Sequence, residues 1–276
     1  MKQIFCNGRV LDLSTPVAMG ILNVAPDSFY DGGNYLTVSG QLKRAEKMLA
    51  EGAAVIDIGA VSTRPGAPGV DQNEELNRLL PAINAIRHHF PGCFISVDTY
   101  RPQVARIMAD HGADIINDIY GGRYDPEMIR TVAGLNIPYI LMHMKGKPET
   151  MQDNPVYTDV VAEIAYFFEQ QVARCREAGI KQVIIDPGFG FGKTVGHNFV
   201  LLSRLDAFRS LGTPILAGLS RKSMINKTLD IKPGEALNGT TVLNTIALLK
   251  GADILRVHDV QAAVEAITLV TMTVKQ

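Results

Sequence analysis

Short apolar runs recur along the chain, and many of them end in a charged or amide side chain. Residues 17–22 lead to Asn23, and residues 94–97 lead to Asp98. Later runs end in or enclose further polar residues, namely Asn117, Asp186, Ser220, Arg256 and His258. A strand that is buried on both faces has such a continuous apolar run. Its C-terminal end is where parallel sheets and barrels place their active sites.

The pattern predicts eight strands that alternate with eight helices. The strands are expected at 17–22, 54–58, 94–97, 114–117, 138–142, 182–186, 214–218 and 253–257. Amphipathic helical stretches lie near 39–51, 73–89, 101–111, 125–134, 158–178, 198–211, 234–250 and 260–272. This alternation indicates an α/β fold with a single TIM-type (β/α)8 barrel over residues 1–276. A doubly wound open sheet is the alternative, but residues 20–25 lack the Gly-rich turn that would favour it.

Two further features belong to this predicted barrel. Apolar pairs at 4–5 and 10–11 flank Asn7-Gly8, which predicts an N-terminal β-hairpin. The first and second strand-to-helix loops, 23–37 and 59–71, exceed the usual length of about two to six residues. Long loops at the catalytic end of a barrel are candidate lids, although surface insertions of this length are also tolerated.

Composition limits the possible partners. The 276 residues carry a net charge of −1, from 27 basic and 28 acidic side chains, so no overall field attracts nucleic acid or a membrane surface. No run approaches the ~18 apolar residues of a membrane span, and the N-terminus lacks the apolar stretch of a signal peptide. The three cysteines, Cys6, Cys93 and Cys175, are odd in number and far apart, as expected of reduced thiols. We therefore expect a cytoplasmic protein with no nucleic-acid or membrane partner.

Three strand-end residues predict a pocket for a flat heterocycle. Asp98, Asn117 and Asp186 end the third, fourth and sixth strands, and in a barrel they converge. Carboxylates accept hydrogen bonds from amino and ring N–H groups, and an amide can donate or accept. The alternative for a strand-end Asp is a cap on the next helix, and Asp98 before Thr99 is suited to that role.

Basic residues after the last two strands predict an anion site. Ser220-Arg221-Lys222-Ser223 follows the seventh strand, and Arg256 and His258 belong to the eighth. Many barrels bind a phosphate at this position. A solvated basic turn is the alternative. It suits Arg256 poorly, because an unpaired charge in an apolar run is costly, and an oxyanion ligand would offset that cost.

The glycine-rich stretch 188–194 is not a P-loop. The motif requires Gly five positions before Gly192, where Pro187 stands. We interpret the stretch as a loop that passes close to a bound ligand, with Lys193 at the rim. His143 follows the fifth strand without an evident partner. No HExxH motif or Cys/His cluster is present, which argues against a protein-held zinc site.

With these residues assembled, nearly the whole chain resembles the dihydropteroate synthases. Residues 20–29 and 57–66 resemble the two signature segments of that family. The other matches follow in family order: Ser96-Val97-Asp98-Thr99, Ile116-Asn117-Asp118, Leu141-Met142-His143-Met144, Asp186-Pro187-Gly188-Phe189-Gly190-Phe191-Gly192-Lys193, Leu219-Ser220-Arg221-Lys222-Ser223 and Arg256-Val257-His258-Asp259.

The resemblance implies a reaction of folate biosynthesis. 6-Hydroxymethyl-7,8-dihydropterin pyrophosphate and p-aminobenzoate would condense to 7,8-dihydropteroate and pyrophosphate, with Mg²⁺ as cofactor. Sulfonamides would inhibit by imitating p-aminobenzoate, and the protein would be a homodimer.

The resemblance also assigns roles to residues. Pterin contacts would come from Asp98, Asn117, Met142, Asp186, Phe191, Lys222 and Arg256. The p-aminobenzoate subsite would contain Phe29, Thr63, Arg64, Pro65, Lys222 and Ser223. Asn23, Arg64, Arg256 and His258 would meet the pyrophosphate, Asn23 partly through Mg²⁺. The residues expected to act in catalysis are Asp31, Arg64, Lys222, Arg256 and His258.

These assignments predict a dissociative, SN1-like path. Pyrophosphate would leave first, and the electron-rich pterin would share the positive charge of the resulting methyl cation. Arg64, Arg256, His258 and Mg²⁺ would neutralise the charge on the leaving group. Asp31 would orient the incoming amine, and the closed loops would exclude water, which would otherwise trap the cation.

The sequence departs from the family pattern at Ala25, Tyr30, Ala60 and Val61, where Thr, Ser and Gly-Glu are usual. All four positions lie in the two long loops, so they bear on loop dynamics and sulfonamide sensitivity. Two alternatives remain: a pterin-binding domain that transfers methyl from methyltetrahydrofolate to a corrinoid, and a non-catalytic pterin-binding module. The basic residues argue against the first, because methyl transfer needs no pyrophosphate site.

Overall fold

Eight parallel strands form a barrel in the computed structural model, which describes residues 2–25, 37–61, 70–146 and 150–274. Their order in the sheet is β8-β7-β6-β5-β4-β3-β10-β9. A parallel bridge between Ile185 and Ile215 joins the two edge strands and closes the barrel. The bounds are β3 Val17–Asn23, β4 Val55–Gly59, β5 Phe94–Asp98, β6 Ile115–Asp118, β7 Tyr139–Met142, β8 Val183–Asp186, β9 Leu216–Ala217 and β10 Ile254–Val257. The predicted (β/α)8 barrel is confirmed.

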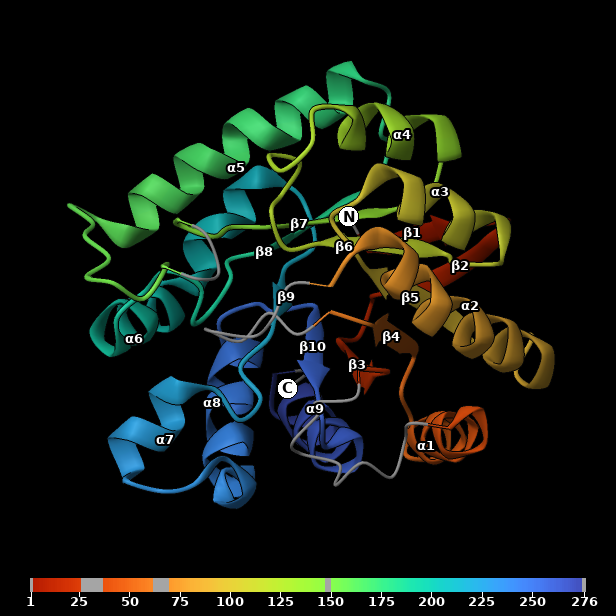
Figure 1. Cartoon of the computed structure of the whole chain (residues 1–276). Coiled ribbons are helices and arrows are strands. Elements are labelled where there is room, and N and C mark those ends of the chain that lie inside the picture. Colours follow the sequence, from red (N-terminus) through yellow and green to blue (C-terminus); the bar gives the residue numbers. More distant parts are fainter. Residues whose placement is uncertain (1, 26–36, 62–69, 147–149, 275–276) are drawn as a thin grey trace.

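Helices surround the strands on the outside of the barrel (Figure 1). They are α1 Val38–Ala50, α2 Gln72–His89, α3 Pro102–Asp110, α4 Glu127–Leu135, α5 Val160–Glu177, α6 Val195–Ser203, α7 Ser223–Leu229, α8 Leu237–Leu249 and α9 Val260–Val274. Local sequence sets several of their starts. Asp71 caps α2 by accepting from the Glu74 amide at 2.9 Å, and Asp159 caps α5 by accepting from the Val161 amide at 2.9 Å.

The structure differs from the predicted elements on the last third of the chain. The helix expected at 198–211 is two elements, α6 and a 3₁₀ helix at Leu205–Leu211. The strand expected at 214–218 contains only Leu216–Ala217. Pro214 has no N–H for the ladder, and the Ile215 amide donates to the Asp253 side chain at 2.9 Å instead. Helix α7 was not predicted, because its seven residues are too few to show a periodic apolar stripe. The two long strand-to-helix loops predicted from the sequence lie largely outside the described residues, at 26–36 and 62–69.

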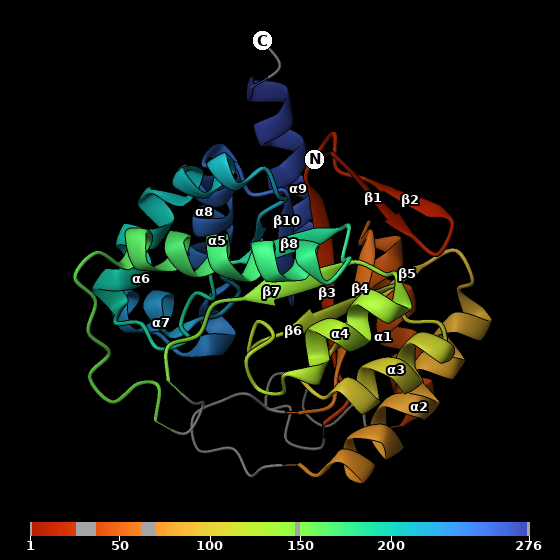
Figure 2. The ribbon, with the colours of Figure 1, turned by 90° about the horizontal axis from the view of Figure 1, so that it is seen from above.

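An antiparallel hairpin closes the N-terminal end of the barrel (Figure 2). It consists of β1 Gln3–Cys6 and β2 Arg9–Asp12. Asn7 and Gly8 turn the chain with φ of 49° and 78°, as a tight hairpin requires. Apolar side chains of the hairpin segment pack against the inward-facing residues at the start of the strands. The hairpin side contributes Ile4, Cys6, Leu11 and Leu13, and the strands contribute Met19, Val55, Ile115, Ile140, Ile184, Leu216 and Ile254. This end is therefore filled, which leaves the C-terminal end for a ligand.

The carboxylate of Asp114 fastens the hairpin to the barrel. Its side chain is 1% exposed and accepts from Arg9 at 2.7 Å, from Arg87 at 2.6 Å and from the Ile95 amide at 2.9 Å. Arg9 comes from β2 and Arg87 from α2, so one buried anion joins the hairpin, a helix and the third barrel strand. Removing one partner of such a group leaves an uncompensated buried charge, which costs about 3–5 kcal/mol.

Two expectations about the chain as a whole are tested by the described residues. Cys6, Cys93 and Cys175 are buried and free of disulfides, as predicted. Within the described ranges, no helix combines the length and the apolar character needed to cross a membrane.

Candidate active site

The C-terminal ends of neighbouring strands align four polar or small residues in one row. The register pairs Asn23 with Gly59, Gly59 with Asp98, and Asp98 with Asn117. Side chains two positions apart point to the same face of a strand, so Asp57 shares the inner face with Gly59. The row therefore places amide and carboxylate groups at the open end of the barrel, as predicted.

Arg256 on β10 is the cation at the centre of this end. Its Nε lies 2.6 Å from Asp57 Oδ2, and its Nη2 lies 3.0 Å from Asp98 Oδ2. Burial acts against its charge, but Asp57 and Asp98 raise the pKa of Arg256 above its ordinary value. From the sequence, an oxyanion ligand was expected to offset the cost of this buried charge. That explanation is incomplete, because two carboxylates already compensate it.

Asp57 is the functional candidate that the sequence analysis missed. It is fully buried, and besides Arg256 it accepts from Asn117 Nδ2 at 3.2 Å. A signal was present, since Asp57 is the charged residue within the otherwise apolar strand β4, two positions before Gly59. Its role is to hold both the cation and the amide in place at the base of the site.

Asp186 and Lys222 lie beside Arg256. A Cβ built on Gly218 would lie 3.9 Å from Asp186 Oδ2, 4.0 Å from Lys222 Nζ and 4.0 Å from Arg256 Cβ. The three side chains therefore all lie close to Gly218. Asp186 Oδ1 also accepts from the Gly188 amide at 2.8 Å. The structure thus brings together the predicted pterin residues Asp98, Asn117, Asp186, Lys222 and Arg256.

Aromatic and thioether side chains form the wall next to Lys222. Lys222 Nζ donates to the Phe189 carbonyl and lies 4.6 Å from the ring centroid of Phe191. Phe191 packs against a cluster that includes Met142, which is paired in register with Asp186. Ser223 follows Lys222 as the first residue of α7.

Burial changes the acidity of the charged groups in the pocket. It raises the pKa of Asp98 to about 7, and the nearby Asp57 adds to this effect although Arg256 opposes it. Burial also raises the pKa of Asp186, against the influence of Lys222. It lowers the pKa of Lys222 to about 8, with Asp186 opposing and Arg256 assisting. Perturbed values of this kind concentrate at functional sites.

His258 is an uncharged hydrogen-bonding group. Its Nδ1 lies 2.9 Å from Ser220 Oγ, which in turn accepts from the His258 backbone N–H at 3.2 Å. Burial, with Arg221 and Arg256 nearby, lowers the pKa of His258 to about 3. At neutral pH the positive charge beside it therefore comes from arginine and not from the imidazole.

The prediction that Lys193 lies at the rim is wrong. Its side chain is buried, and its Nζ lies 2.8 Å from the Gly188 carbonyl and 3.1 Å from His143 Nδ1. His143, which had no evident partner in the sequence, therefore has one. The basic residue reaches inward because the loop carbonyls turn toward it.

Five predicted site residues lie outside the described residues, namely Phe29, Asp31, Thr63, Arg64 and Pro65. Asn23 is described, and its Oδ1 and Asp98 Oδ2 would lie 3.8 and 3.7 Å from a Cβ on Gly59. Among the described residues, no group of three His, Cys, Asp or Glu side chains could hold a metal ion.

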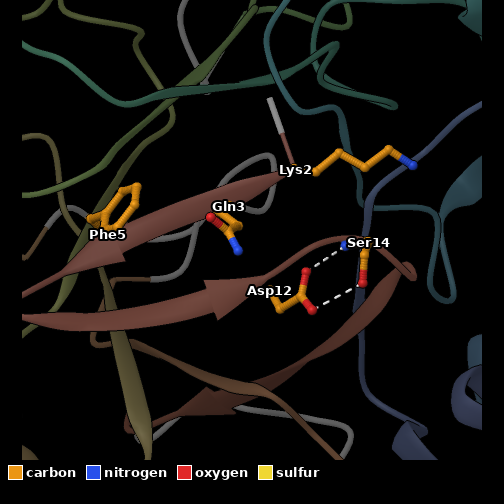
Figure 3. A pocket seen from close by; sticks show the side chains of 5 residues that line it. All are labelled: Lys2, Gln3, Phe5, Asp12 and Ser14. Atoms are coloured by element: carbon orange, nitrogen blue, oxygen red, sulfur yellow. Dashed lines mark hydrogen bonds between the residues drawn. The ribbon is translucent and has the colours of Figure 1, made fainter.

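A surface hollow of about 460 Å³ lies at the hairpin, lined by Lys2, Gln3, Phe5, Asp12 and Ser14 (Figure 3). Its Asp12 accepts two hydrogen bonds from Ser14, at 2.8 and 2.9 Å. The hollow is at the filled end of the barrel, away from the polar cluster described above. It contains none of the predicted site residues that the structure describes.

Comparison with known proteins identifies the family. The family model described as "Pterin binding enzyme" matches residues 19–258. Dihydropteroate synthase from Escherichia coli K12 is 47% identical over 273 residues, which cover 98% of this chain and 96% of that protein. The chain belongs to the dihydropteroate synthase family. It is therefore an enzyme, a transferase.

Solved structures agree with this family assignment. The Yersinia pestis dihydropteroate synthase in a sulfonamide drug complex superposes with a TM-score of 0.96 at 42% identity, covering 99% of this chain and 100% of that one. The Xanthomonas albilineans synthase with 4-aminobenzoic acid gives 0.91 at 41% identity, covering 99% and 98%. These matches support the synthase over the methyltransferase and the non-catalytic module.

Substitution Asp57→Asn tests the role of the missed residue. Loss of the carboxylate charge leaves Arg256 with one counter-ion, so its guanidinium is oriented less firmly. We expect kcat/KM to fall about 100-fold, which is the size of effect typical of losing a hydrogen bond to a buried charged group. Steady-state kinetics would measure this. Asp253→Asn is the matched control at the other end of the barrel, where the carboxylate accepts from the Ile215 amide at 2.9 Å. Equal kcat/KM values for both variants would contradict the assignment.

The shifted acidities predict a bell-shaped dependence of kcat/KM on pH. Asp98 carries its negative charge and accepts with both oxygens only when ionised, so activity falls as the pH drops below about 7. Lys222 carries its positive charge and its third N–H donor only when protonated, so activity falls as the pH rises above about 8. The optimum is expected between these values. A profile that stays flat from pH 6 to 9 would show that neither group controls the reaction.

Proposed function

We propose that this chain joins 6-hydroxymethyl-7,8-dihydropterin pyrophosphate to p-aminobenzoate, forming 7,8-dihydropteroate and pyrophosphate in folate biosynthesis. The observation that carries the proposal is the cluster of Asp57, Asp98, Asn117 and Arg256 at the open end of the barrel, with Asp186 and Lys222 beside it. The family's structures include the Thermus thermophilus enzyme in complex with 6HMPPP, at a TM-score of 0.85 and 38% identity.

The pterin ring would bind between the strand-end polar groups. Asp98 and Asp186 offer carboxylate acceptors to its amino and ring N–H groups, and Asn117 can donate and accept. Phe191 and Met142 offer flat and polarisable surfaces for the faces of the ring. A pocket with an apolar wall and a few convergent polar groups suits such a heterocycle.

The pyrophosphate would lie toward β10 and the loop after β9. Arg256 supplies a delocalised cation with a planar fork of donors. His258 and Ser220 add neutral hydrogen-bonding groups next to it. Arg64 would add a second guanidinium from the second long loop, as the family resemblance implies. Together these groups favour departure of the leaving group, because they stabilise the negative charge that grows on it.

The p-aminobenzoate subsite would lie between the pterin and the long loops. Lys222 and Ser223 are its described members, and Phe29, Thr63 and Pro65 are assigned to it by the resemblance. Sulfonamides would occupy the same subsite, in keeping with the sulfonamide complex of the Yersinia pestis relative. Asp31 would orient the amine toward the methylene carbon.

The chemistry follows a dissociative path. The C–O bond to pyrophosphate breaks first, and both bonding electrons leave with the oxygen. The aryl amine then attacks the pterin-methyl cation and loses a proton. Buried carboxylates at Asp98 and Asp186 favour the cation electrostatically, and exclusion of water prevents its capture as the alcohol.

Magnesium is the cofactor we propose. Asn23 provides a neutral amide oxygen at the open end, near Asp98, and oxygen donors of this kind suit Mg²⁺. Most of the remaining ligands would be water and substrate phosphate, so a dedicated protein cage is not required. The bound ion would offset charge on the pyrophosphate.

Pyrophosphate release by the purified protein tests the proposed function. With both substrates and Mg²⁺, we expect dihydropteroate and pyrophosphate in equal amounts, and removal of Mg²⁺ by chelation should abolish both. Lys222→Ala and Arg256→Ala should each lower kcat/KM by about 100-fold or more. Lys250→Ala and Arg204→Ala are matched controls, because these residues form exposed ion pairs with Asp206 and Asp159.

The same assay distinguishes the chemical path. Substrate labelled with ¹⁸O in the bridging position is incubated without p-aminobenzoate. Reversible cleavage to a cation and pyrophosphate would scramble the label into non-bridging positions. Absence of scrambling, with normal turnover once the amine is added, would refute the dissociative order. Absence of any product with both substrates would refute the proposed function itself.

The homodimer is a further part of this proposal. Helices α8 and α9, which pack against each other, carry exposed apolar side chains, namely Leu237, Val242, Leu249, Leu269, Met272 and Val274. A surface of this kind is typical of a protein interface. We expect light scattering to give twice the 30.0 kDa mass of one chain, and Leu269→Lys with Met272→Lys to give the monomer. Monomeric wild-type protein would contradict it.

A further inference from the structure

The buried cation Lys193 lies directly behind the proposed pterin pocket. Its side chain is 2% exposed. Nζ lies 2.8 Å from the Gly188 carbonyl, 3.0 Å from the Phe191 carbonyl and 3.1 Å from His143 Nδ1. An ammonium group has three N–H donors, and these three short contacts provide three acceptors. Within the described ranges Lys193 forms no ion pair, and its direct hydrogen-bond partners are neutral groups.

The two carbonyls that hold Lys193 belong to the loop between β8 and α6, whereas His143 follows β7. The same loop carries groups of the site on its other face. The Phe189 carbonyl accepts from Lys222 Nζ, and the ring of Phe191 lies 4.6 Å from that atom. Successive residues of one short loop therefore contact two lysines, Lys193 behind the loop and Lys222 in the pocket.

Two glycines bring this loop against the end of β7. Gly188 and Gly192 have φ of +69° and +63°, in the left-handed region that favours glycine. A Cβ on Gly188 would lie 2.0 Å from the His143 carbonyl oxygen, and one on Gly192 would lie 2.2 Å from that of Lys145. The backbones approach too closely for any side chain, and the contacts of Lys193 hold them together.

We infer that Lys193, with His143, is a positioning residue for the synthase reaction: by joining the β8–α6 loop to the end of β7, it fixes the placement of Lys222 and Phe191 toward the pterin. The inference rests on the proposed function, since it concerns the same pocket. Neither Lys193 nor His143 needs to touch substrate.

The electrostatic environment is consistent with this role. Burial, together with the positive charges of Lys193, Arg123 and Lys145, keeps the pKa of His143 well below its ordinary value, so the imidazole is neutral and Nδ1 can accept. Burial also lowers the pKa of Lys193, although Asp186 opposes this. On the pocket side, the low pKa of Lys222 depends first on its burial beneath this loop.

Substitution Lys193→Met tests the inference, because it keeps most of the length and the apolar character of the stem and removes the three donors. We expect KM for the pterin pyrophosphate to rise about 10-fold or more, as a misplaced binding group predicts. Water should then reach Lys222 and raise its pKa, so the alkaline limb of the kcat/KM profile should move upward from about 8. A purely structural role would lower the melting temperature without moving this limb.

A second variant and a control separate the possible causes. His143→Leu removes one hydrogen-bond acceptor and leaves Lys193 in place. If the alkaline limb of the kcat/KM profile also moves upward in this variant, the cause cannot be the loss of a positive charge near Lys222. Arg87→Met disrupts the Asp114 contacts at the other end of the barrel and should lower stability with KM and the pH profile unchanged.

The outcomes are distinct. Wild-type KM and an unmoved alkaline limb in both Lys193→Met and His143→Leu would overturn the positioning role. If Lys193→Met does not fold, the His143→Leu result decides alone. Failure of the wild-type protein to turn over the pterin pyrophosphate would instead refute the proposed function, whatever the variants do.

Discussion

The ion pairs of Arg256 with Asp57 and Asp98 are the interaction on which the polar end of the barrel depends. They connect β10 to β4 and β5 through the interior, across the intervening β3. A guanidinium can meet both carboxylates at once, since its donors point in several directions in one plane. Without it, two poorly solvated carboxylates would face each other, which costs about 3–5 kcal/mol for an uncompensated buried charge.

The alternation of side chains along the strands gives the two ends of the barrel opposite character. The inward positions nearest the strand starts, such as Met19, Val55 and Ile254, are apolar and pack beneath the hairpin. Two positions later the same strands present Asp57 and Arg256. Burial of apolar side chains at one end stabilises the fold. This stabilisation offsets the free-energy cost of keeping charged groups poorly solvated at the other end. Poor solvation shifts their pKa values toward neutrality, where both protonation states are accessible.

Strand-end chemistry was predictable from the sequence, because apolar runs and their terminal residues are local patterns. Asp98, Asn117 and Asp186 were placed correctly for this reason. Asp57 was missed although it is a charged residue within an apolar run, because the run alone does not show that its side chain faces Arg256 across the barrel. The helix α7 was missed because a short helix held by tertiary packing carries little periodic signal. The split of the predicted helix 198–211 occurs at Arg204, whose φ of −116° is not helical.

The two lysines that contact the β8–α6 loop show what the sequence pattern alone does not predict. Lys193 and Lys222 both follow strand ends, and both are long cations that can extend into solvent or into the protein. Lys193 turns inward because glycines in the left-handed region direct the Gly188 carbonyl toward the interior, where it becomes an acceptor. Lys222 remains in the pocket because the carbonyl of Phe189 faces the other way. The directions of the backbone carbonyls thus determine that Lys193 supports the loop and that Lys222 faces the substrate. These directions cannot be read from the spacing of residues in the sequence.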